Sequence, residues 1–206
     1  MNQQEWADAP PGCDGVELLQ ARFDRHVYDR HMHDTYAIGV TLHGVQRFWC
    51  RGSSHDSTAG QVIVIRPGEV HDGRSGAAGG YAYRMFYVRP DVLHALDDGT
   101  PRNACQFTVR GPIVSTPAVF RALNAAWTAV ALSPSSLAAD ELLVRGLSML
   151  ASRASERPVP THASLDIVGH VRPRGRVLAA TATAGMTATG SVVAQFEALL
   201  FPRSGR

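Results

Sequence analysis

Short segments of β-branched and aromatic residues, separated by glycine-rich turns, dominate the chain from Val16 to about Val109. Such segments are typical of strands, in which successive side chains point to opposite faces of a sheet. The segments that fit are VELLQARF, HVYDRHMH, YAIGVTLH, VQRFWCR, QVIVIR, YAYRMFYV and CQFTV. Short strands with turn signals between them predict an antiparallel sandwich or barrel. The segment RSGAAGGY is expected to be a loop that covers the mouth of such a barrel.

The pattern changes to a helical period after Pro112. In the segment 115–132, Thr116 is expected at the N-cap and Pro117 at the first helical position. The apolar residues that follow recur at helical spacing and predict a helix with one apolar face. They are Phe120, Leu123, Trp127 and Val130.

A second helix is expected in the segment 133–154, where Ser133 and Pro134 repeat the start signal. Its apolar stripe consists of Leu143, Leu147 and Leu150, followed by Ala154. The short connection between the two helices favours an antiparallel pair. Apolar stripes usually belong to a domain core, but a helix pair added to one face of a barrel has only that face to cover. We therefore expect the three leucines to contribute to dimerisation.

These patterns divide the chain into four parts. Residues 1–14 are expected to form a flexible arm, because Pro10, Pro11 and Gly12 interrupt any regular period. Near the other end, the Ala/Thr/Gly-rich stretch from Ala179 to Gly190 has no convincing apolar period. The predicted parts are the arm (1–14), a barrel (15–111), a helical dimerisation pair (112–157) and a low-complexity tail (158–206) that is disordered or non-native.

The composition is that of a globular domain. Of 206 residues, 45% are hydrophobic and 18% are charged, so the chain can bury a sizeable core and is not of the disordered class. All 20 basic residues are arginine, which indicates a GC-rich genome more than any function. The formal net charge of +2 is too small and too evenly spread to predict a surface for nucleic acid.

The cysteines and the N-terminus bear on location. Cys13, Cys50 and Cys105 are odd in number and form no C-x-x-C pair, which argues against a disulfide framework and a thiolate zinc site. The N-terminus lacks a basic-then-apolar signal pattern, and no run of 18 apolar residues occurs. We expect a soluble protein of the cytoplasm that makes no membrane contact.

Three histidines form the main candidate constellation. His31 and His33 are two residues apart on a predicted strand, so their side chains point to the same side. In the segment 60–73, a buried-looking strand is followed by a Pro67-Gly68 turn and then by His71. A turn of this sort can bring His71 back towards the first two histidines.

The order H-x-H, glycine-ended strand, P-G-x-x-H and then YRMFYV resembles the paired motifs of a cupin barrel. More narrowly, with the two helices that follow, it resembles the N-terminal ligand-binding domain of AraC-type transcription regulators, from about Val16 to Ala154. The resemblance implies a mostly β fold: a cupin-like antiparallel β-barrel (jelly roll) followed by two antiparallel helices. It also implies that the chain is a module that binds a small-molecule effector and dimerises, and not an enzyme.

In that interpretation the barrel encloses a mostly apolar cavity with a few placed polar groups. Aromatic rings would stack on the effector, and imidazole or guanidinium groups would supply hydrogen bonds or charge. The candidate ligand-binding residues are His31, His33, Tyr36, Arg47, Trp49, His71 and Tyr83. One sequence does not fix the phase of a strand, so the same aromatic residues could instead face the helices or the solvent.

Metal binding is the alternative function for the histidines. His31, His33 and His71 together could form a three-histidine centre, as in a small metal-dependent cupin enzyme. Cupins that bind metal usually add a glutamate a few residues after the H-x-H pair, but Ala37 and Ile38 stand there in this chain. We therefore expect no metal and no cofactor. No G-x-S-x-G elbow or phosphate-binding glycine loop follows a predicted strand.

The output of the implied regulator is a separate question. In a complete AraC-type regulator the sensory domain is followed by two helix-turn-helix motifs that read the major groove. The residues after Pro160 contain no pair of capped amphipathic helices. We expect a homodimer, or a mixed dimer with a full-length relative, and no direct DNA binding by this chain. The low-complexity tail is consistent with a frame shift in GC-rich DNA, and a legitimately shortened sensory protein is the alternative.

Overall fold

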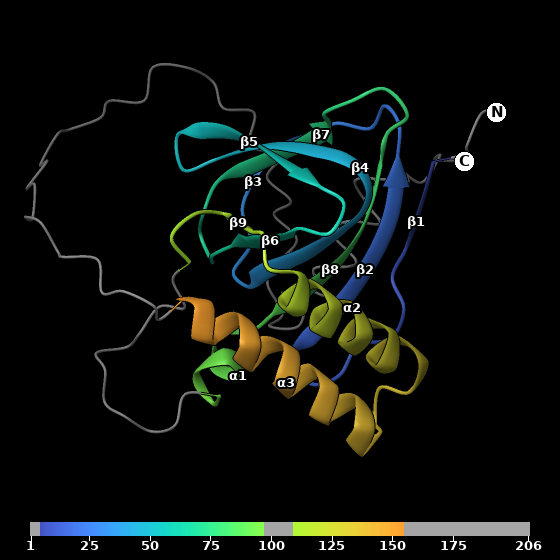
Figure 1. Ribbon diagram of the computed structural model, residues 1–206, viewed down its shortest axis with the longest axis vertical. Helices are drawn as coiled ribbons and strands as arrows, with labels where there is room; N and C mark the ends of the chain where they lie inside the picture. The colour runs from blue at the N-terminus through green and yellow to red at the C-terminus, as the bar shows by residue number, and fades with distance from the viewer. Residues whose placement is uncertain (1–4, 97–108, 155–206) are drawn as a thin grey trace, which may run out of the picture.

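The computed structural model describes residues 5–96 and 109–154 (Figure 1). Strands precede helices along most of the chain, as the hydrophobic pattern predicts. The elements are β1 (Trp6–Asp8), β2 (Val16–Phe23), β3 (Tyr28–His31), β4 (Tyr36–Cys50), β5 (Ser53–Thr58), β6 (Val62–Ile65), β7 (His71–Ser75), β8 (Tyr81–Val88), α1 (Pro90–His94), β9 (Ile113–Val114), α2 (Pro117–Leu132) and α3 (Leu137–Ala154).

All strand pairs among the described residues are antiparallel, and β4 organises them. One layer has the order β1-β2-β8-β4-β6-β9. The long strand β4 also pairs with β5 and β7, and β7 pairs with β3, which makes a second layer. The predicted antiparallel cupin-type fold followed by helices is confirmed. The sheet is nevertheless open, because the pairing of the described strands does not close into a ring.

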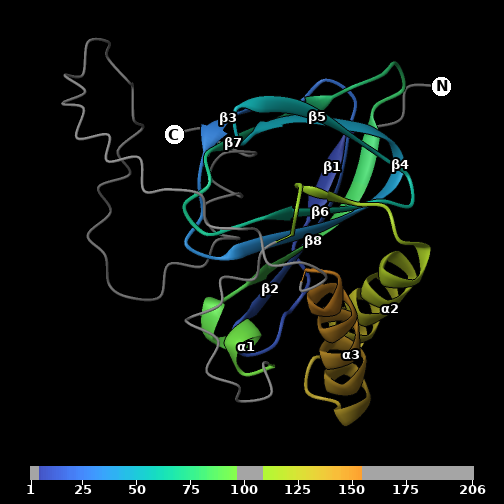
Figure 2. The ribbon, with the colours of Figure 1, turned by 60° about the vertical axis from the view of Figure 1, so that its left-hand side comes forward.

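The bend that carries β4 from one layer to the other depends on Gly44. The backbone of this residue has φ +69°, in the left-handed region that favours glycine. A Cβ at this position would lie 2.0 Å from the carbonyl oxygen of Gly80, so no side chain fits. The pairing of β4 with β8 also shifts register between Thr41 and His43. The bend thus lets β4 take part in both strand layers, which face each other (Figure 2).

Two apolar cores lie on opposite sides of the β8 layer. Phe86 and Val88 point to the side that the helices cover, where they join the larger core. Tyr83, Met85 and Tyr87 point to the space between the two strand layers. Because side chains alternate along a strand, β8 is a wall that contacts the helices on one face and the interior of the strand fold on the other.

The helix pair covers one outer face of the strand fold (Figure 2). α2 begins at Pro117 after Thr116, as expected, and its buried residues are Val119, Leu123, Ala126, Trp127 and Val130. α3 begins at Leu137 and not near Ser133, because the hydroxyl of Ser136 accepts a hydrogen bond from the N–H of Ala139 and so caps the helix. The two helices run antiparallel (Figure 1), as predicted.

Several strands differ from the prediction. VELLQARF and YAYRMFYV form β2 and β8, whereas YAIGVTLH and VQRFWCR are one continuous strand, β4. The expected flexible arm is partly wrong, because Trp6–Asp8 pairs with β2. The segment CQFTV falls mainly, and the predicted tail 158–206 entirely, outside the described residues. Among the described helices, none combines the length and apolar character needed to cross a bilayer.

Candidate functional site

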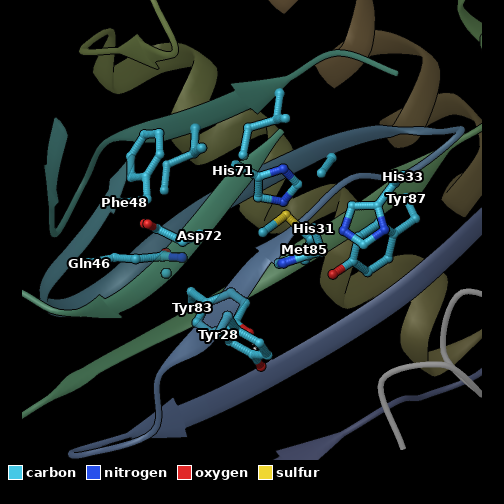
Figure 3. A pocket seen from close by; sticks show the side chains of 14 residues that line it. Tyr28, His31, His33, Gln46, Phe48, His71, Asp72, Tyr83, Met85 and Tyr87 are labelled. Atoms are coloured by element: carbon cyan, nitrogen blue, oxygen red, sulfur yellow. Dashed lines mark hydrogen bonds between the residues drawn. The ribbon is translucent and has the colours of Figure 1, made fainter. Parts of the chain in front are cut away.

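A small cavity lies between the two strand layers. Its volume is about 30 Å³, which is room for roughly one or two water molecules. The side chains that line it come from both layers (Figure 3). The lining residues are Tyr28, His31, His33, Ala37, Gln46, Phe48, Ile63, Ile65, His71, Asp72, Gly73, Tyr83, Met85 and Tyr87.

The three predicted histidines meet at this cavity because β3 and β7 are paired. His31 ends β3 and lies directly opposite His71, the first residue of β7. His33 follows β3 and is not within the strand, contrary to the prediction. The ring centroids are 4.3 Å apart for His31 and His71, 4.9 Å for His31 and His33, and 5.2 Å for His33 and His71.

Main-chain carbonyls fix the proton positions on two of these rings. Nδ1 of His31 lies 2.6 Å from the carbonyl oxygen of Asp29, and Nδ1 of His71 lies 2.9 Å from that of Glu69. A carbonyl oxygen only accepts hydrogen bonds, so Nδ1 carries the proton in both neutral rings. The other nitrogen, Nε2, then carries a lone pair.

The site keeps the histidines neutral. Burial, together with the nearby His31 and His71, lowers the pKa of His33 to about 3. Burial and the nearby His31 lower the pKa of His71 to about 4. Burial also lowers the pKa of His31, against a hydrogen bond to Asp29 that raises it. At neutral pH the cluster thus offers nitrogen lone pairs to a hydrogen-bond donor or a metal ion.

The rest of the lining is mostly apolar, with a few polar groups. The hydroxyl groups of Tyr28 and Tyr83 are hydrogen-bonded to each other at 3.0 Å. The Oε1 atom of Gln46 is buried without a hydrogen-bond partner. The ring of Tyr87 lies 5.0 Å from that of His33, measured between centroids. The cavity therefore combines aromatic walls with a hydrogen-bond acceptor, the Oε1 atom of Gln46, that has no donor among the described residues.

Four of the seven predicted ligand-binding residues line the cavity, and strand phase excludes the others. His31, His33, His71 and Tyr83 line it, whereas Tyr36, Arg47 and Trp49 do not. On β4, Gln46 and Phe48 point inward. Arg47 and Trp49 alternate with them along the strand and therefore point outward.

The three excluded residues have other contacts. Tyr36 packs in the core on the helix side of the sheet. Arg47 forms a bidentate ion pair with Asp56. Trp49 is half-buried, with the guanidinium of Arg30 4.1 Å from its ring centroid.

Sequence reasoning missed several residues of the cavity. Alternation along β8 from Tyr83 would have found Met85 and Tyr87. Tyr28 precedes His31 on β3, and it too was in a predicted strand. Gln46 and Phe48 carry no signal of their own, because their inward direction depends on the bend in β4.

The leucines predicted for dimerisation lie in the core of this chain. Leu143, Leu147 and Leu150 are buried in the apolar core that the helices share with the sheet. They are therefore not available to a second chain in this fold. The outer face of the helix pair instead has a groove lined by Ala118, Arg121, Ala122, Ala125, Leu142, Arg145 and Met149.

A metal ion fits the histidines with a small adjustment. The ligand nitrogens all lie within 4.8 Å of one another. Nitrogens bound to one tetrahedral zinc ion at about 2.1 Å lie about 3.4 Å apart, so the three rings are close to the arrangement that one ion requires. Ala37 lines the cavity but supplies no carboxylate. The carboxylate of Asp72 already accepts a hydrogen bond from the main-chain N–H of Trp49 at 2.7 Å. The donor set is thus three imidazoles.

Comparison with known proteins identifies the family of the domain. The family model described as the AraC-like ligand binding domain matches residues 15–147. The chain belongs to this family. The match covers the strands around the cavity and most of the helix pair, which confirms the resemblance at the level of the domain. No curated protein matches the chain.

Solved structures similar to this chain include cupins. An RmlC-like cupin family protein from Methanocaldococcus jannaschii has 10% identity and a TM-score of 0.40, over 44% of this chain and 86% of that chain. A cupin superfamily protein from Desulfitobacterium hafniense has 13% identity and a TM-score of 0.39, over 43% of this chain and 81% of that chain. Oxalate decarboxylase from Bacillus subtilis has 15% identity and a TM-score of 0.33, over 36% and 21%. The chain thus spans about a fifth of that enzyme's length.

Proposed function

We propose that this chain is the effector-binding and dimerisation module of an AraC-type transcription regulator, and that its effector binds at the histidine-lined cavity. One observation carries the proposal: three neutral imidazoles converge in a mostly apolar cavity between the strand layers. The family match to an AraC-like ligand binding domain supports it. In this proposal the module binds its effector and catalyses no reaction.

The chemistry of the lining defines the effector. The imidazole lone pairs and the buried oxygen of Gln46 accept hydrogen bonds, so the effector carries O–H or N–H donors. Its body is apolar enough to lie against Phe48 and the tyrosines. Since the cavity is small, the effector is compact or displaces Met85, whose flexible side chain packs near Gly39.

A thermal-unfolding screen of small hydroxylated and amine compounds tests the proposal. Compounds that raise the melting temperature of the wild type should have a much smaller effect on His71→Ala, because binding only to the native state is what stabilises it. His43→Ala is the matched control, since His43 is exposed on β4 and does not line the cavity. Equal stabilisation of wild type and His71→Ala would place the effector elsewhere.

Dimerisation in this proposal uses the outer groove of the helix pair and not the buried leucines. The groove is lined by small and apolar side chains between Arg121 and Arg145. Glu141 and Arg145 are exposed on α3, four residues apart. An antiparallel contact between two copies of α3 whose two-fold axis passes beside residue 143 would place Glu141 of one copy opposite Arg145 of the other. We assign no DNA contact to the described residues and place the regulator in the cytoplasm.

A small metal-dependent cupin enzyme is the second candidate, and the geometry of the three histidines favours it. His31, His33 and His71 would hold the ion, which would supply a Lewis acid in the cavity. Elemental analysis of protein purified without chelators distinguishes the two functions. About one iron, manganese, zinc or nickel ion per chain, lost in His71→Ala, would favour the enzyme, whereas substoichiometric metal favours the effector module.

A further inference from the structure

The turn between β6 and β7 contacts two of the three histidines. Pro67 and Gly68 form its centre, with φ +74° at Gly68 and a hydrogen bond from the N–H of Glu69 to the carbonyl of Arg66 at 3.1 Å. The N–H of Gly68 donates to the carbonyl of His33 at 2.8 Å. The carbonyl of Glu69 accepts the Nδ1 proton of His71 at 2.9 Å. The position of this turn thus sets the orientation of the His71 ring.

The carboxylate of Glu69 fixes the turn. It accepts two hydrogen bonds from the guanidinium of Arg51, at 2.7 and 3.0 Å. It also accepts from the main-chain N–H and Nε of Arg66, at 2.9 and 2.7 Å. Its side chain is only 13% exposed. Burial alone would raise the pKa of Glu69, but the hydrogen bonds from Arg51 and Arg66 lower it overall, so the carboxylate is charged at neutral pH.

Arg51 stands at a turn position whose backbone conformation is unfavourable for an arginine. Its φ of +52° is the one positive value among the non-glycine residues that the structure describes. It lies with Gly52 in the two-residue turn between β4 and β5, where asparagine or glycine is preferred. The same guanidinium also donates to the carbonyl of Val109 at 3.2 Å. The hairpin turn thus presents an arginine where glycine or asparagine would be less strained, and its guanidinium joins Glu69 to the main chain at Val109.

We propose that Glu69 is a positioning residue for the cavity: its carboxylate, clamped by Arg51 and Arg66, holds the turn so that its carbonyl keeps the proton of His71 on Nδ1. Nε2 of His71 then presents its lone pair to whatever the cavity binds. This inference rests on the proposed use of the histidine cluster, but its test needs no effector. It adds Glu69, Arg51 and Arg66 to the site as residues that act on the histidine without touching the effector.

His31 provides an internal control for the test. Its Nδ1 bonds to the carbonyl of Asp29, two residues earlier, as His71 bonds to Glu69. Glu69 and its two arginines act on the His71 turn and not on the Asp29 carbonyl. A general loss of structure would therefore change both rings, whereas loss of positioning changes His71 alone.

The experiment is a two-bond ¹H–¹⁵N spectrum of the metal-free, ¹⁵N-labelled full chain at pH 7.5, which shows which nitrogen of each histidine carries the proton. In the wild type, His31 and His71 are expected to be protonated on Nδ1. In Glu69→Ala, the Nδ1–H fraction of His71 should fall by about half or more while His31 is unchanged. Glu69→Gln, which keeps an acceptor oxygen, should restore part of the Nδ1–H fraction of His71. Asp56→Asn, which breaks the ion pair with Arg47, is the matched control.

Arg51→Gly gives a second route to the same result. Glycine suits the backbone at φ +52°, while the hydrogen bonds from the Arg51 guanidinium to Glu69 are lost. This variant should form the turn at least as readily as the wild type, and it should still lower the Nδ1–H fraction of His71. The proposal is overturned if His71 stays protonated on Nδ1 in both Glu69→Ala and Arg51→Gly, or if His31 and His71 change together. Neither outcome depends on whether an effector binds, so failure here is distinct from failure of the proposed function.

Discussion

At the scale of single residues, burial and a few carbonyl contacts decide the chemistry of the cavity. His33 and His71 are neutral because burial lowers their pKa values to about 3 and about 4. The Nδ1 proton of His71 is held by the carbonyl of Glu69. An imidazole in this state accepts a hydrogen bond or binds a metal ion through Nε2. The cavity therefore presents imidazole nitrogens that can accept a hydrogen bond.

The same lowered pKa values predict an acid-sensitive fold. In the unfolded chain these histidines titrate near pH 6.5, so below that pH the unfolded state binds more protons than the folded state. Stability is fully present above about pH 6.5 and falls as the pH drops towards the folded pKa values. Between pH 6.5 and 5.5 we expect each of His33 and His71 to remove on the order of 1 kcal/mol from the free energy of unfolding.

Urea unfolding at several pH values checks this expectation. His33→Gln should have a smaller loss of stability over this range than the wild type, since glutamine does not titrate. His43→Gln, at an exposed site, is the control. An unchanged pH slope in His33→Gln would contradict the burial of a neutral His33.

Gly44 and Gly52 offer a matched pair for testing the bend in β4. Both have positive φ, +69° and +82°. A Cβ at Gly44 would meet the carbonyl oxygen of Gly80 at 2.0 Å, whereas a Cβ at Gly52 would meet nothing within 4 Å. Gly44→Ala should therefore cost about 2 kcal/mol or more, and Gly52→Ala about 1 kcal/mol, in the free energy of unfolding. Equal costs in denaturant unfolding would show that the bend tolerates a side chain.

Strand phase limits what could be predicted about single residues. The order and spacing of the H-x-H and P-G-x-x-H motifs predict that His31, His33 and His71 lie together, and all three line the cavity. For Arg47 and Trp49 only the residue type suggests a role in binding, and the alternation of β4 points them outward. Which face of β4 is the interior depends on a bend that involves the distant Gly80, and one sequence does not show such long-range contacts.

At the scale of elements, the contact of α2 with β8 joins the helix pair to the wall of the cavity. Nε1 of Trp127 donates to the carbonyl of Met85 at 3.2 Å, and Met85 lines the cavity. The guanidinium of Arg84 lies 4.3 Å from the Trp127 ring centroid and donates to Asn124 and Thr128. Alternation along β8 thus sends Met85 to the cavity and Arg84 to the helix.

Truncation of Trp127 should therefore weaken the whole domain. Trp127→Ala removes a buried ring, its hydrogen bond and its contact with Arg84, and we expect a cost of about 3–5 kcal/mol in the free energy of unfolding. Trp49→Ala, at a half-buried site on the outer face, should cost about 1 kcal/mol or less. Chemical denaturation measures both. Similar costs for the two variants would contradict a structural role of the α2 contact.

The elements that the sequence predicts well are those with apolar periodicity. β2, β8 and α2 carry it and have the predicted bounds or nearly so. β5 and β7 have the polar sequences SSHDST and HDGRS, and they are strands because they pair with the long strand β4. Tertiary pairing of this kind overrides local propensity, so pattern analysis does not detect it.

At the scale of the whole molecule, the proposed effector cavity lies in the strand fold and the proposed association surface lies on the helices. The outer groove, with Ala125 and Met149 in its lining, is the proposed contact between two copies. Met149→Glu should place a charge in that contact and shift a dimer towards monomer. Leu132→Glu is the control, because Leu132 is 78% exposed and does not line the groove.

Sedimentation velocity at micromolar concentration measures this shift. The wild type and Leu132→Glu are expected to sediment as dimers, and Met149→Glu as a monomer. A monomeric wild type, or a dimeric Met149→Glu, would rule out the groove as the dimer contact.

The central claim is that the effector binds in the histidine-lined cavity. The most direct test is to determine which residues an effector contacts. Compounds that stabilise the protein in the thermal screen would be added to ¹⁵N-labelled, metal-free chain while the histidine ring signals are recorded. We predict that the signals of His33 and His71 shift together and saturate, while those of the exposed His43 stay unchanged. Saturable binding that leaves both cavity histidines unchanged would contradict the claim that the cavity is the effector site.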